Sequence, residues 1–366
     1  MISPGLIDIA QCPDCGSAVT SGSGGVHCSK CGRVFGADAG YLDLRPLAQF
    51  QEQTKYLDEA LHADARHESI APPLLGSRIR NDMLRRFLKP AQGDRIVDLG
   101  CGSGRTLAWN AQSGAGLTGI DIAPYFAPEA VKQSDLMLGD LRRLPIRAGA
   151  FGKAWSLDVL EHLSKPALIE MLTEANRVLA GGGALFVYTH VRKNGWLAGG
   201  TRLVNRFAAF CERLGLLDLG QERLRKSDHV NPLTDHDDLK RVAAECGFTI
   251  ERITYYTPIV GAFVENVLVR IAEKSLARRA QRAQLAGKSG SKPDGAVSDD
   301  ARKAARKAAQ ARVRQGGALY GALVMLSWVM KFDVVAFGRV RSGPFFALLR
   351  KAGPAAHANH PPEGRG

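Results

Sequence analysis

The sequence predicts an α/β protein with a mainly parallel, nucleotide-binding sheet, a small cysteine-rich module in front of it and a helical insertion before its last strand. Three features support this fold class. An apolar run leads into a glycine-rich turn at residues 95–104, two Cys-x-x-Cys pairs lie within the first 31 residues, and a basic and apolar stretch fills residues 258–343. With 366 residues, the chain can form one large domain and a small one.

The glycine-rich turn predicts the first strand–turn–helix unit of the sheet. Residues 95–99 form an apolar run typical of a buried strand, and Gly100, Gly102 and Gly104 follow at a spacing of two. Glycine allows a tight turn and close approach of a ligand to the backbone. Residues 106–112 can begin a helix whose first N–H groups face the same ligand. The unit therefore predicts a nucleotide-binding α/β domain.

The turn does not match the dinucleotide pattern Gly-x-Gly-x-x-Gly, because Arg105 or Leu107 takes the place of the third glycine, depending on the register. Asp98, two residues before the first glycine, suits the cationic amino-acid end of a sulfonium ligand better than a pyrophosphate. On these residues the chain resembles the class I S-adenosylmethionine-dependent methyltransferases of the type 11 group, whose first motif is an acidic residue followed by Gly-x-Gly-x-Gly.

The later motifs of that family follow in the expected order. Residues 117–121 form a second short strand that ends in an acid, and residues 139–141 resemble the adenine-contacting turn. Residues 154–162 (AWSLDVLEH) resemble the fourth strand and its Val-Leu-Glu-His segment, and a fifth strand over residues 184–188 has the family's spacing. The resemblance implies a Rossmann-like, seven-stranded methyltransferase sheet.

The resemblance also implies the cofactor, S-adenosylmethionine, and the positions that contact it. The acid of the second strand is placed to accept hydrogen bonds from the ribose hydroxyls. The full set of predicted cofactor-binding residues is Asp98, Gly100, Cys101, Gly102, Gly104, Asp121, Ile122, Asp140, Leu141 and Leu157.

Two Cys-x-x-Cys pairs near the N-terminus predict a structural zinc site. The pairs are separated by twelve residues and each is followed by a glycine, which lets backbone N–H groups turn toward the sulfurs. The predicted ligands are Cys12, Cys15, Cys28 and Cys31. Disulfides are the alternative. Residues 11–44 resemble the small zinc ribbons in front of some methyltransferase domains. Such a ribbon either binds the methyl acceptor or stabilises the N-terminal part of the chain.

Charge and cysteine usage indicate where the protein works. Of the net charge of +13, a surplus of nine lies between Arg270 and Arg314, which argues against a broad nucleic-acid groove across the core. The other three cysteines are scattered singly, as in a reducing compartment. No signal-peptide pattern opens the chain. We therefore expect a cytoplasmic protein.

The chain departs from a minimal methyltransferase after the fifth strand. We expect a helix over residues 201–214, then a helix over residues 235–246 capped by Thr234, and a sixth strand over residues 249–256. The best candidate for the seventh strand comes about ninety residues later, at residues 344–351. Residues 258–343, between the sixth and seventh strands, would then form an insertion on the side of the sheet where the methyl acceptor binds.

These boundaries divide the chain into six parts. We expect a zinc ribbon over residues 1–44, an N-terminal helical segment over 45–90, a methyltransferase core over 91–257, a basic and apolar helical insertion over 258–343, the last core strand over 344–352 and a disordered tail over 353–366.

The insertion carries a polybasic segment, residues 301–314, followed directly by an apolar run of fifteen residues, 316–330. A bilayer core needs about twenty apolar residues, so this run is short for a span. Two interpretations stay open. The run forms a buried cap over the acceptor, or residues 301–330 contact a membrane peripherally at its inner face, with the basic helix against anionic headgroups.

Methyl transfer chiefly requires alignment of acceptor, methyl group and sulfur, but a hydroxyl acceptor also needs a base. The candidate catalytic residues are His190, at the end of the fifth strand, and His229, in the segment before the 235–246 helix. His162 belongs to the Val-Leu-Glu-His segment, where the resemblance implies a structural role.

Three functions are compatible with these features. We favour an S-adenosylmethionine-dependent methyltransferase acting on a small-molecule or lipid-like acceptor, at oxygen or carbon, because the insertion is apolar. The alternative is a ribosomal or transfer RNA methyltransferase that uses the zinc ribbon and basic segment to bind its acceptor. A third hypothesis, a non-enzymatic binding protein, is disfavoured by the intact acidic and glycine positions.

Overall fold

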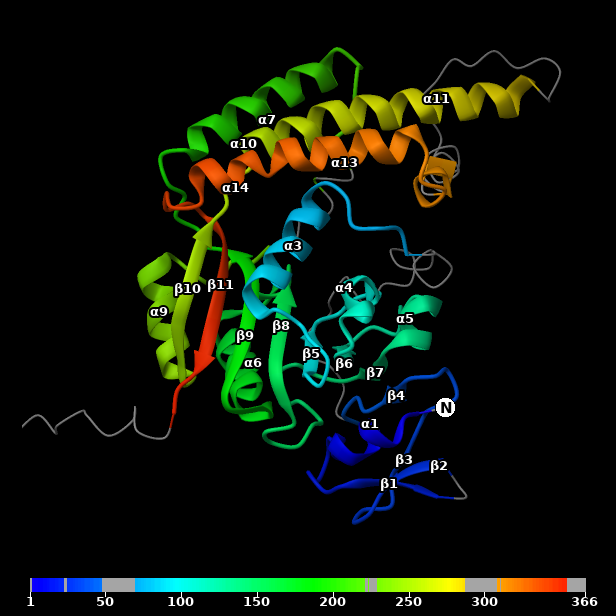
Figure 1. Ribbon diagram of the computed structural model, residues 1–366, viewed down its shortest axis with the longest axis vertical. Helices are drawn as coiled ribbons and strands as arrows, with labels where there is room; N and C mark the ends of the chain where they lie inside the picture. The colour runs from blue at the N-terminus through cyan, green and yellow to red at the C-terminus, as the bar shows by residue number, and fades with distance from the viewer. Residues whose placement is uncertain are drawn as a thin grey trace, which may run out of the picture.

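The computed structural model describes residues 2–22, 25–47, 70–220, 223, 229–286, 308–309 and 311–353. Its centre is an eight-stranded sheet with the order β10-β11-β9-β8-β5-β6-β7-β4 (Figure 1). The strands are β4 (Leu42–Asp43), β5 (Arg95–Leu99), β6 (Gly116–Asp121), β7 (Asp135–Leu138), β8 (Phe151–Leu157), β9 (Leu179–His190), β10 (Phe248–Tyr255) and β11 (Pro344–Lys351).

The predicted fold class is confirmed. Strands β5 to β9 pair in parallel, as expected for units in which helices connect successive strands. The last strand, β11, lies between β9 and β10 and pairs antiparallel with both, opposing Phe345 to Thr189 and to Tyr255. The predicted helical insertion before the last strand is present.

The predicted number of strands was wrong by one. The two-residue strand β4 comes from the end of the predicted zinc ribbon and pairs in parallel with β7 at the sheet edge. Two residues are too few to give a periodic pattern in the sequence. The addition covers an edge of β7 that would otherwise expose unpaired backbone groups.

The N-terminal module holds a short helix, α1 (Pro4–Ile9), and a three-stranded sheet made of β1 (Val19–Gly22), β2 (Gly25–Cys28) and β3 (Val34–Phe35). Its apolar side chains join the core beneath the main sheet, where Leu6, Ile9 and Phe35 are buried. The Gln11 N–H donates to the Pro145 carbonyl at 2.9 Å. The module is therefore packed against the core domain.

Helices cover both faces of the main sheet. On one face lie α6 (Lys165–Val178) and α9 (His236–Glu245), which pack apolar side chains such as Leu168 and Leu239 against the strands. On the other lie α3 (Gly76–Leu88), α4 (Arg105–Asn110) and α5 (Pro128–Gln133). Amphipathic spacing explains the buried face of α3, which includes Ile79 and Leu84.

The cap of α9 differs from the prediction. The capping residue is Asp235, whose side chain accepts from the Asp238 N–H at 3.0 Å, and not Thr234. The Thr234 N–H instead donates to the Asp238 carboxylate at 2.9 Å. Asp and Thr are both good capping residues, so the sequence alone did not decide between neighbours.

The insertion forms a layer of helices beyond the end of the sheet where the parallel strands finish (Figure 1). It contains α10 (Ile259–Phe263), a π-helical turn η4 (Val264–Val269), α11 (Arg270–Ala286), α13 (Ala318–Met330) and α14 (Phe332–Phe337), and α7 (Ala198–Arg213) packs beside α10. Residues 301–307 and the predicted tail from 354 onward lie outside the described residues.

The insertion is tied to the start of α3. Leu75 has a positive φ of 55°, and no side chain of its own segment caps the helix. The Leu75 N–H donates to Ser327 Oγ of α13 at 2.7 Å, and the Gly76 N–H donates to Glu265 Oε1 of η4 at 3.1 Å. The insertion thus supplies acceptors for the first N–H groups of α3, which helices leave without internal partners.

Candidate cofactor and acceptor site

The glycine-rich turn has the geometry that its sequence requires. Gly100, Gly102 and Gly104 have φ angles of 82°, 54° and 79°, in the left-handed region that favours glycine. A Cβ atom on Gly100 would lie 2.5 Å from a Val159 methyl carbon, and one on Gly104 would lie 2.5 Å from Ala130 Cβ. Conformation explains glycine at all three positions, and close packing adds to it at Gly100 and Gly104.

Asp121 holds the turn from the neighbouring strand. Its carboxylate accepts from the Gly102 N–H at 2.7 Å and from the Ala123 N–H at 3.0 Å. The Gly100 and Cys101 N–H groups donate to the Ile120 carbonyl at 2.9 and 3.1 Å. The predicted ribose acceptor therefore also fixes the loop that the resemblance assigns to the cofactor.

Asp98 is buried at the end of β5 and is 3% exposed. Burial, reinforced by the nearby charge of Asp121, raises the pKa of Asp98 to about 7. A buried carboxyl with this pKa is poised to ionise when a cation is brought beside it. That property suits the ammonium group of the predicted cofactor.

The pKa of Asp98 predicts a pH dependence of cofactor affinity. The ammonium group of S-adenosylmethionine should bind the carboxylate and not the protonated acid. Raising the pH from 6 to 7.5 increases the ionised fraction of a group with a pKa of about 7, so the association constant should rise roughly eightfold. Calorimetric titration at both pH values measures this. In the Asp98→Asn variant the affinity for S-adenosylmethionine should be lower and should no longer depend on pH. If the affinity of this variant still depended on pH, a group other than Asp98 would be responsible.

The other predicted cofactor residues follow the carboxyl ends of adjacent strands. Asp140, after β7, accepts from the Arg142 N–H at 2.9 Å and forms an ion pair with the Arg142 guanidinium at 3.0 Å. Leu141 is partly buried against the core, and Leu157 ends β8 opposite Tyr188 of β9. Cys101 is buried within the turn, and Ile122 is half-buried after β6. Their contacts with a cofactor stay a prediction.

Three histidines and a glutamate meet where β8 and β9 end. His162 and His229 have ring centroids 4.8 Å apart, and those of His190 and His229 are 5.2 Å apart. His190 Nδ1 lies 4.0 Å from Glu161 Oε1. Sequence reasoning proposed His190 and His229 separately and did not single out Glu161; its adjacency to His162 was the available signal.

Glu161 is the buried member of this group, with 1% of its surface exposed. Its Oε2 accepts from Thr189 Oγ1 at 2.9 Å. Burial, followed by the charge of Asp158, raises the pKa of Glu161 to about 8. A buried acid with a raised pKa beside three imidazoles makes this cluster a candidate functional site.

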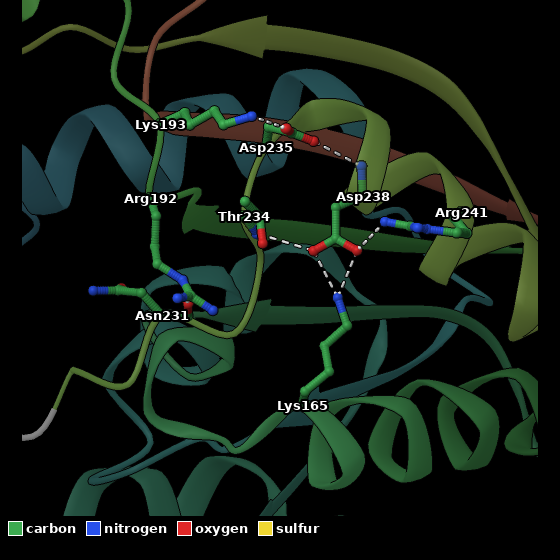
Figure 2. Close-up of polar contacts among 8 residues, drawn as sticks. All are labelled: Lys165, Arg192, Lys193, Asn231, Thr234, Asp235, Asp238 and Arg241. Atoms are coloured by element: carbon green, nitrogen blue, oxygen red, sulfur yellow. Dashed lines mark hydrogen bonds and ion pairs between the residues drawn. The ribbon is translucent and has the colours of Figure 1, made fainter.

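The loop that carries His229 is hydrogen-bonded to the chain segment that follows β9. The Arg192 and Lys193 N–H groups donate to the Leu233 and Thr234 carbonyls at 2.9 and 3.0 Å, and Arg192 Nε donates to the Asn231 carbonyl at 2.8 Å. Figure 2 shows these segments side by side. This pairing brings His229 back to the ends of β8 and β9.

A salt-bridge cluster fixes the far end of that loop (Figure 2). Asp238 of α9 receives the Lys165 ammonium at 2.7 Å and the Arg241 guanidinium at 2.8 Å, in addition to the Thr234 N–H. Lys193 pairs with Asp235 at 2.7 Å. The cluster links α6, α9 and the chain after β9, so it supports the loop from outside the site.

An arginine and two tyrosines lie between the strand ends and the insertion. Arg80 of α3 lies 3.3 Å from the Asp158 carboxylate and stacks over the Tyr188 ring at 5.5 Å. The Tyr188 and Tyr256 rings are neighbours, with centroids 6.4 Å apart. Burial and the charge of Asp158 raise the pKa of Tyr188 above its usual range. Asp158 has a positive φ of 55°, a backbone conformation that is uncommon for residues other than glycine.

The four N-terminal cysteines have the geometry of a zinc site. The Cys12 and Cys31 sulfurs are 3.7 Å apart and the Cys15 and Cys28 sulfurs 3.4 Å apart. Bonds of about 2.3 Å in a tetrahedron place sulfurs about 3.8 Å from one another. The Lys30 and Cys31 N–H groups donate to the Cys28 sulfur at 3.4 Å. These thiols fit a structural zinc ion, which would leave no open position for catalysis.

Comparison with known proteins agrees with this site. Residues 97–187 match a family model described as a methyltransferase domain. A ubiquinone biosynthesis O-methyltransferase of Xanthomonas axonopodis pv. citri is 31% identical over 119 residues, which cover 30% of this chain and 48% of that protein. A probable tRNA methyltransferase 9B of Mus musculus is 30% identical over 162 residues, 43% of this chain and 36% of that protein.

The chain therefore spans about half or less of these relatives' length, and the match lies in the central domain. Among solved structures, that of the [4+2]-cyclase SpnF aligns with 84% of this chain and 97% of its own, at 17% identity and a TM-score of 0.46.

Proposed function

Because its central domain makes the chain a class I S-adenosylmethionine-dependent methyltransferase, we propose that the protein transfers a methyl group to a small-molecule or lipid-like acceptor, at oxygen or carbon. Bound S-adenosylmethionine would supply the methyl group on a sulfonium centre. The glycine-rich turn would bind the cofactor, the Asp121 carboxylate would orient it, and Asp98 would neutralise its ammonium group.

The chain's other contribution is to align the acceptor and exclude water from the reacting atoms. The insertion and α3 lie over the strand ends, where Arg80 of α3 stacks on Tyr188 of β9 and the Tyr188 ring neighbours that of Tyr256. This arrangement supports an acceptor side that lies under the helical layer. An apolar acceptor would reach it through that layer.

The observation that carries the choice of acceptor is an exposed apolar stripe on α7. Leu203, Phe207, Phe210 and Leu214 recur every three or four residues and so share one helix face, and each is between 48% and 69% exposed. The exposed side chains of Arg202, Arg206 and Arg213 lie along one edge of the stripe. An apolar stripe bordered by arginines is typical of a helix that lies in the interface of an anionic bilayer.

Helices α13 and α14 carry further exposed apolar side chains. They form a continuous 20-residue stretch, Ala318–Phe337, with the length and mean hydropathy (1.5) to cross a membrane. Met325, Trp328 and Phe332 are exposed, but Ser327 and Asp333 are buried. Asp333 accepts from the Val260 and Gly261 N–H groups at 3.0 and 2.7 Å. These bonds to α10, and that of Ser327 to α3, favour a helix lying along the protein at the inner face of the membrane.

A methyl-transfer assay tests the proposal. Zinc-loaded protein with methyl-tritiated S-adenosylmethionine is incubated with anionic phospholipid vesicles containing a total lipid extract, or with total RNA. We expect tritium in the organic phase. Phe207→Ser/Phe210→Ser should reduce it by about 100-fold or more, because burial of each of the two phenylalanine side chains contributes about 1.5–3 kcal/mol and 1.4 kcal/mol is a tenfold change. Val34→Ser, an exposed apolar position on the zinc ribbon, is the matched control.

The affinity for S-adenosylmethionine should be unchanged in both variants, since α7 lies outside the glycine-rich turn. Tritium in RNA and none in the organic phase would contradict the lipid-like acceptor and support the RNA alternative.

A further inference from the structure

We propose that Glu161, His162 and His229 bind a divalent first-row transition metal ion at the acceptor side of the site. One ligand atom from each of the three residues lies within 4.8 Å of the other two. A carboxylate with two imidazoles is a donor set that binds such ions. This site is separate from the four-cysteine site, whose thiolates select softer ions.

The three residues come from two distant segments that are held together by backbone contacts. Glu161 and His162 belong to the short 3-10 helix η3 (Leu160–His162) after β8. The Val230 and Asn231 N–H groups, next to His229, both donate to the Glu161 carbonyl at 2.9 Å. Asn231 has a positive φ of 51°, so the loop is bent to make this contact. Such a contact serves to bring His229 to Glu161.

The carboxylate of Glu161 is oriented before any ion binds. Thr189 Oγ1 donates to its Oε2 at 2.9 Å, and His190 Nδ1 lies 4.0 Å from its Oε1. Metal-binding carboxylates are generally held by such hydrogen bonds, and loss of the supporting group weakens binding. Thr189 is fully buried and is therefore a positioning residue for this site.

The position of the ion suggests that it activates the methyl acceptor, an inference that rests on the proposed function. Three protein ligands leave coordination positions open at the ends of β8 and β9. A bound hydroxyl group would have its pKa lowered by the ion. The acceptor oxygen would then lose its proton to a neighbouring base, for which His190 is the candidate, and its electron pair would form the O–CH₃ bond. The S–CH₃ bond breaks with its electron pair left on sulfur, which loses its positive charge. The inferred substrate class is thus a hydroxyl-bearing acceptor.

Manganese binding tests the site without any methyl transfer. Mn²⁺ is titrated into full-length protein loaded with one equivalent of zinc, which the four thiolates take up, so that zinc does not occupy the Glu161 site, and the electron paramagnetic resonance signal of free Mn²⁺ is followed. We expect one Mn²⁺ per chain. Glu161→Gln and His229→Gln should each weaken binding by about 100-fold, and Thr189→Val by about 10-fold, since it removes only the supporting hydrogen bond. His27→Gln, on the zinc ribbon, should bind as the wild type does.

Circular dichroism and thermal unfolding establish that each variant is folded. His162→Gln is included because its side chain is less buried than that of Glu161. No Mn²⁺ bound by the wild type, or binding unchanged in both His162→Gln and His229→Gln, would overturn the site. Because S-adenosylmethionine is absent from the titration, failure of the metal site leaves cofactor binding standing, and failure of the proposed function leaves the metal site standing.

Discussion

Replacing Asp121 with alanine should weaken S-adenosylmethionine binding by about 100-fold or more, as measured by calorimetric titration. The carboxylate accepts from the N–H groups of Gly102 and Ala123 at 2.7 and 3.0 Å, so alanine releases the turn that the cofactor contacts. Each hydrogen bond to a charged group contributes about 1.5–3 kcal/mol, and 1.4 kcal/mol is a tenfold change in affinity. The predicted bonds to the ribose would be lost as well.

Two further variants distinguish a role of Asp121 in cofactor binding from a general loss of structure. Asp121→Asn keeps one acceptor oxygen and should lie between the wild type and alanine. Asp38→Ala removes an exposed carboxylate from the N-terminal module and should bind the cofactor normally. Unchanged affinity in a folded Asp121→Ala protein would show that the β6 carboxylate does not position the cofactor.

Loss of zinc should destabilise the entire protein and not only its N-terminal module. We expect Cys31→Ser to lower the thermal unfolding midpoint by on the order of 10 °C, because structural zinc contributes several kcal/mol of folding free energy. Leu6, Ile9 and Phe35 belong to the same buried cluster as strand residues of the main sheet, and β4 pairs with β7. The destabilisation should therefore reach the core.

Differential scanning calorimetry with zinc analysis measures this effect. Lys30→Ala changes an exposed side chain of the same Cys-x-x-Cys turn without touching a ligand, and its midpoint should stay within about 2 °C of the wild type. A protein that contains no zinc, or a Cys31→Ser variant that unfolds at the wild-type temperature, would contradict the structural role.

Much of the fold could be predicted because its signals are local. The glycine-rich turn after β5 and the paired cysteines are short patterns whose chemistry limits the backbone to few conformations. The displaced last strand, β11, was recognised from an apolar run where the sheet still lacked a strand. Each of these depends on residues close together in the sequence.

The acceptor side could not be assembled in the same way. His229 reaches Glu161 because its neighbours Val230 and Asn231 bond to the Glu161 carbonyl and residues 231–234 pair with the chain after β9. The Asp238 cluster that supports this loop joins three separate elements. The contact of Ser327 with Leu75 spans 252 residues. Such convergence depends on tertiary packing, which single-sequence patterns do not encode.

The most direct test of the central claim is calorimetric titration of S-adenosylmethionine into the zinc-loaded wild-type protein at pH 7.5. We predict a single site per chain with micromolar affinity, from which S-adenosylhomocysteine displaces the cofactor. Absence of binding by folded, zinc-containing protein would contradict the assignment of the glycine-rich turn and Asp121 to this cofactor, and with it the proposed methyl transfer.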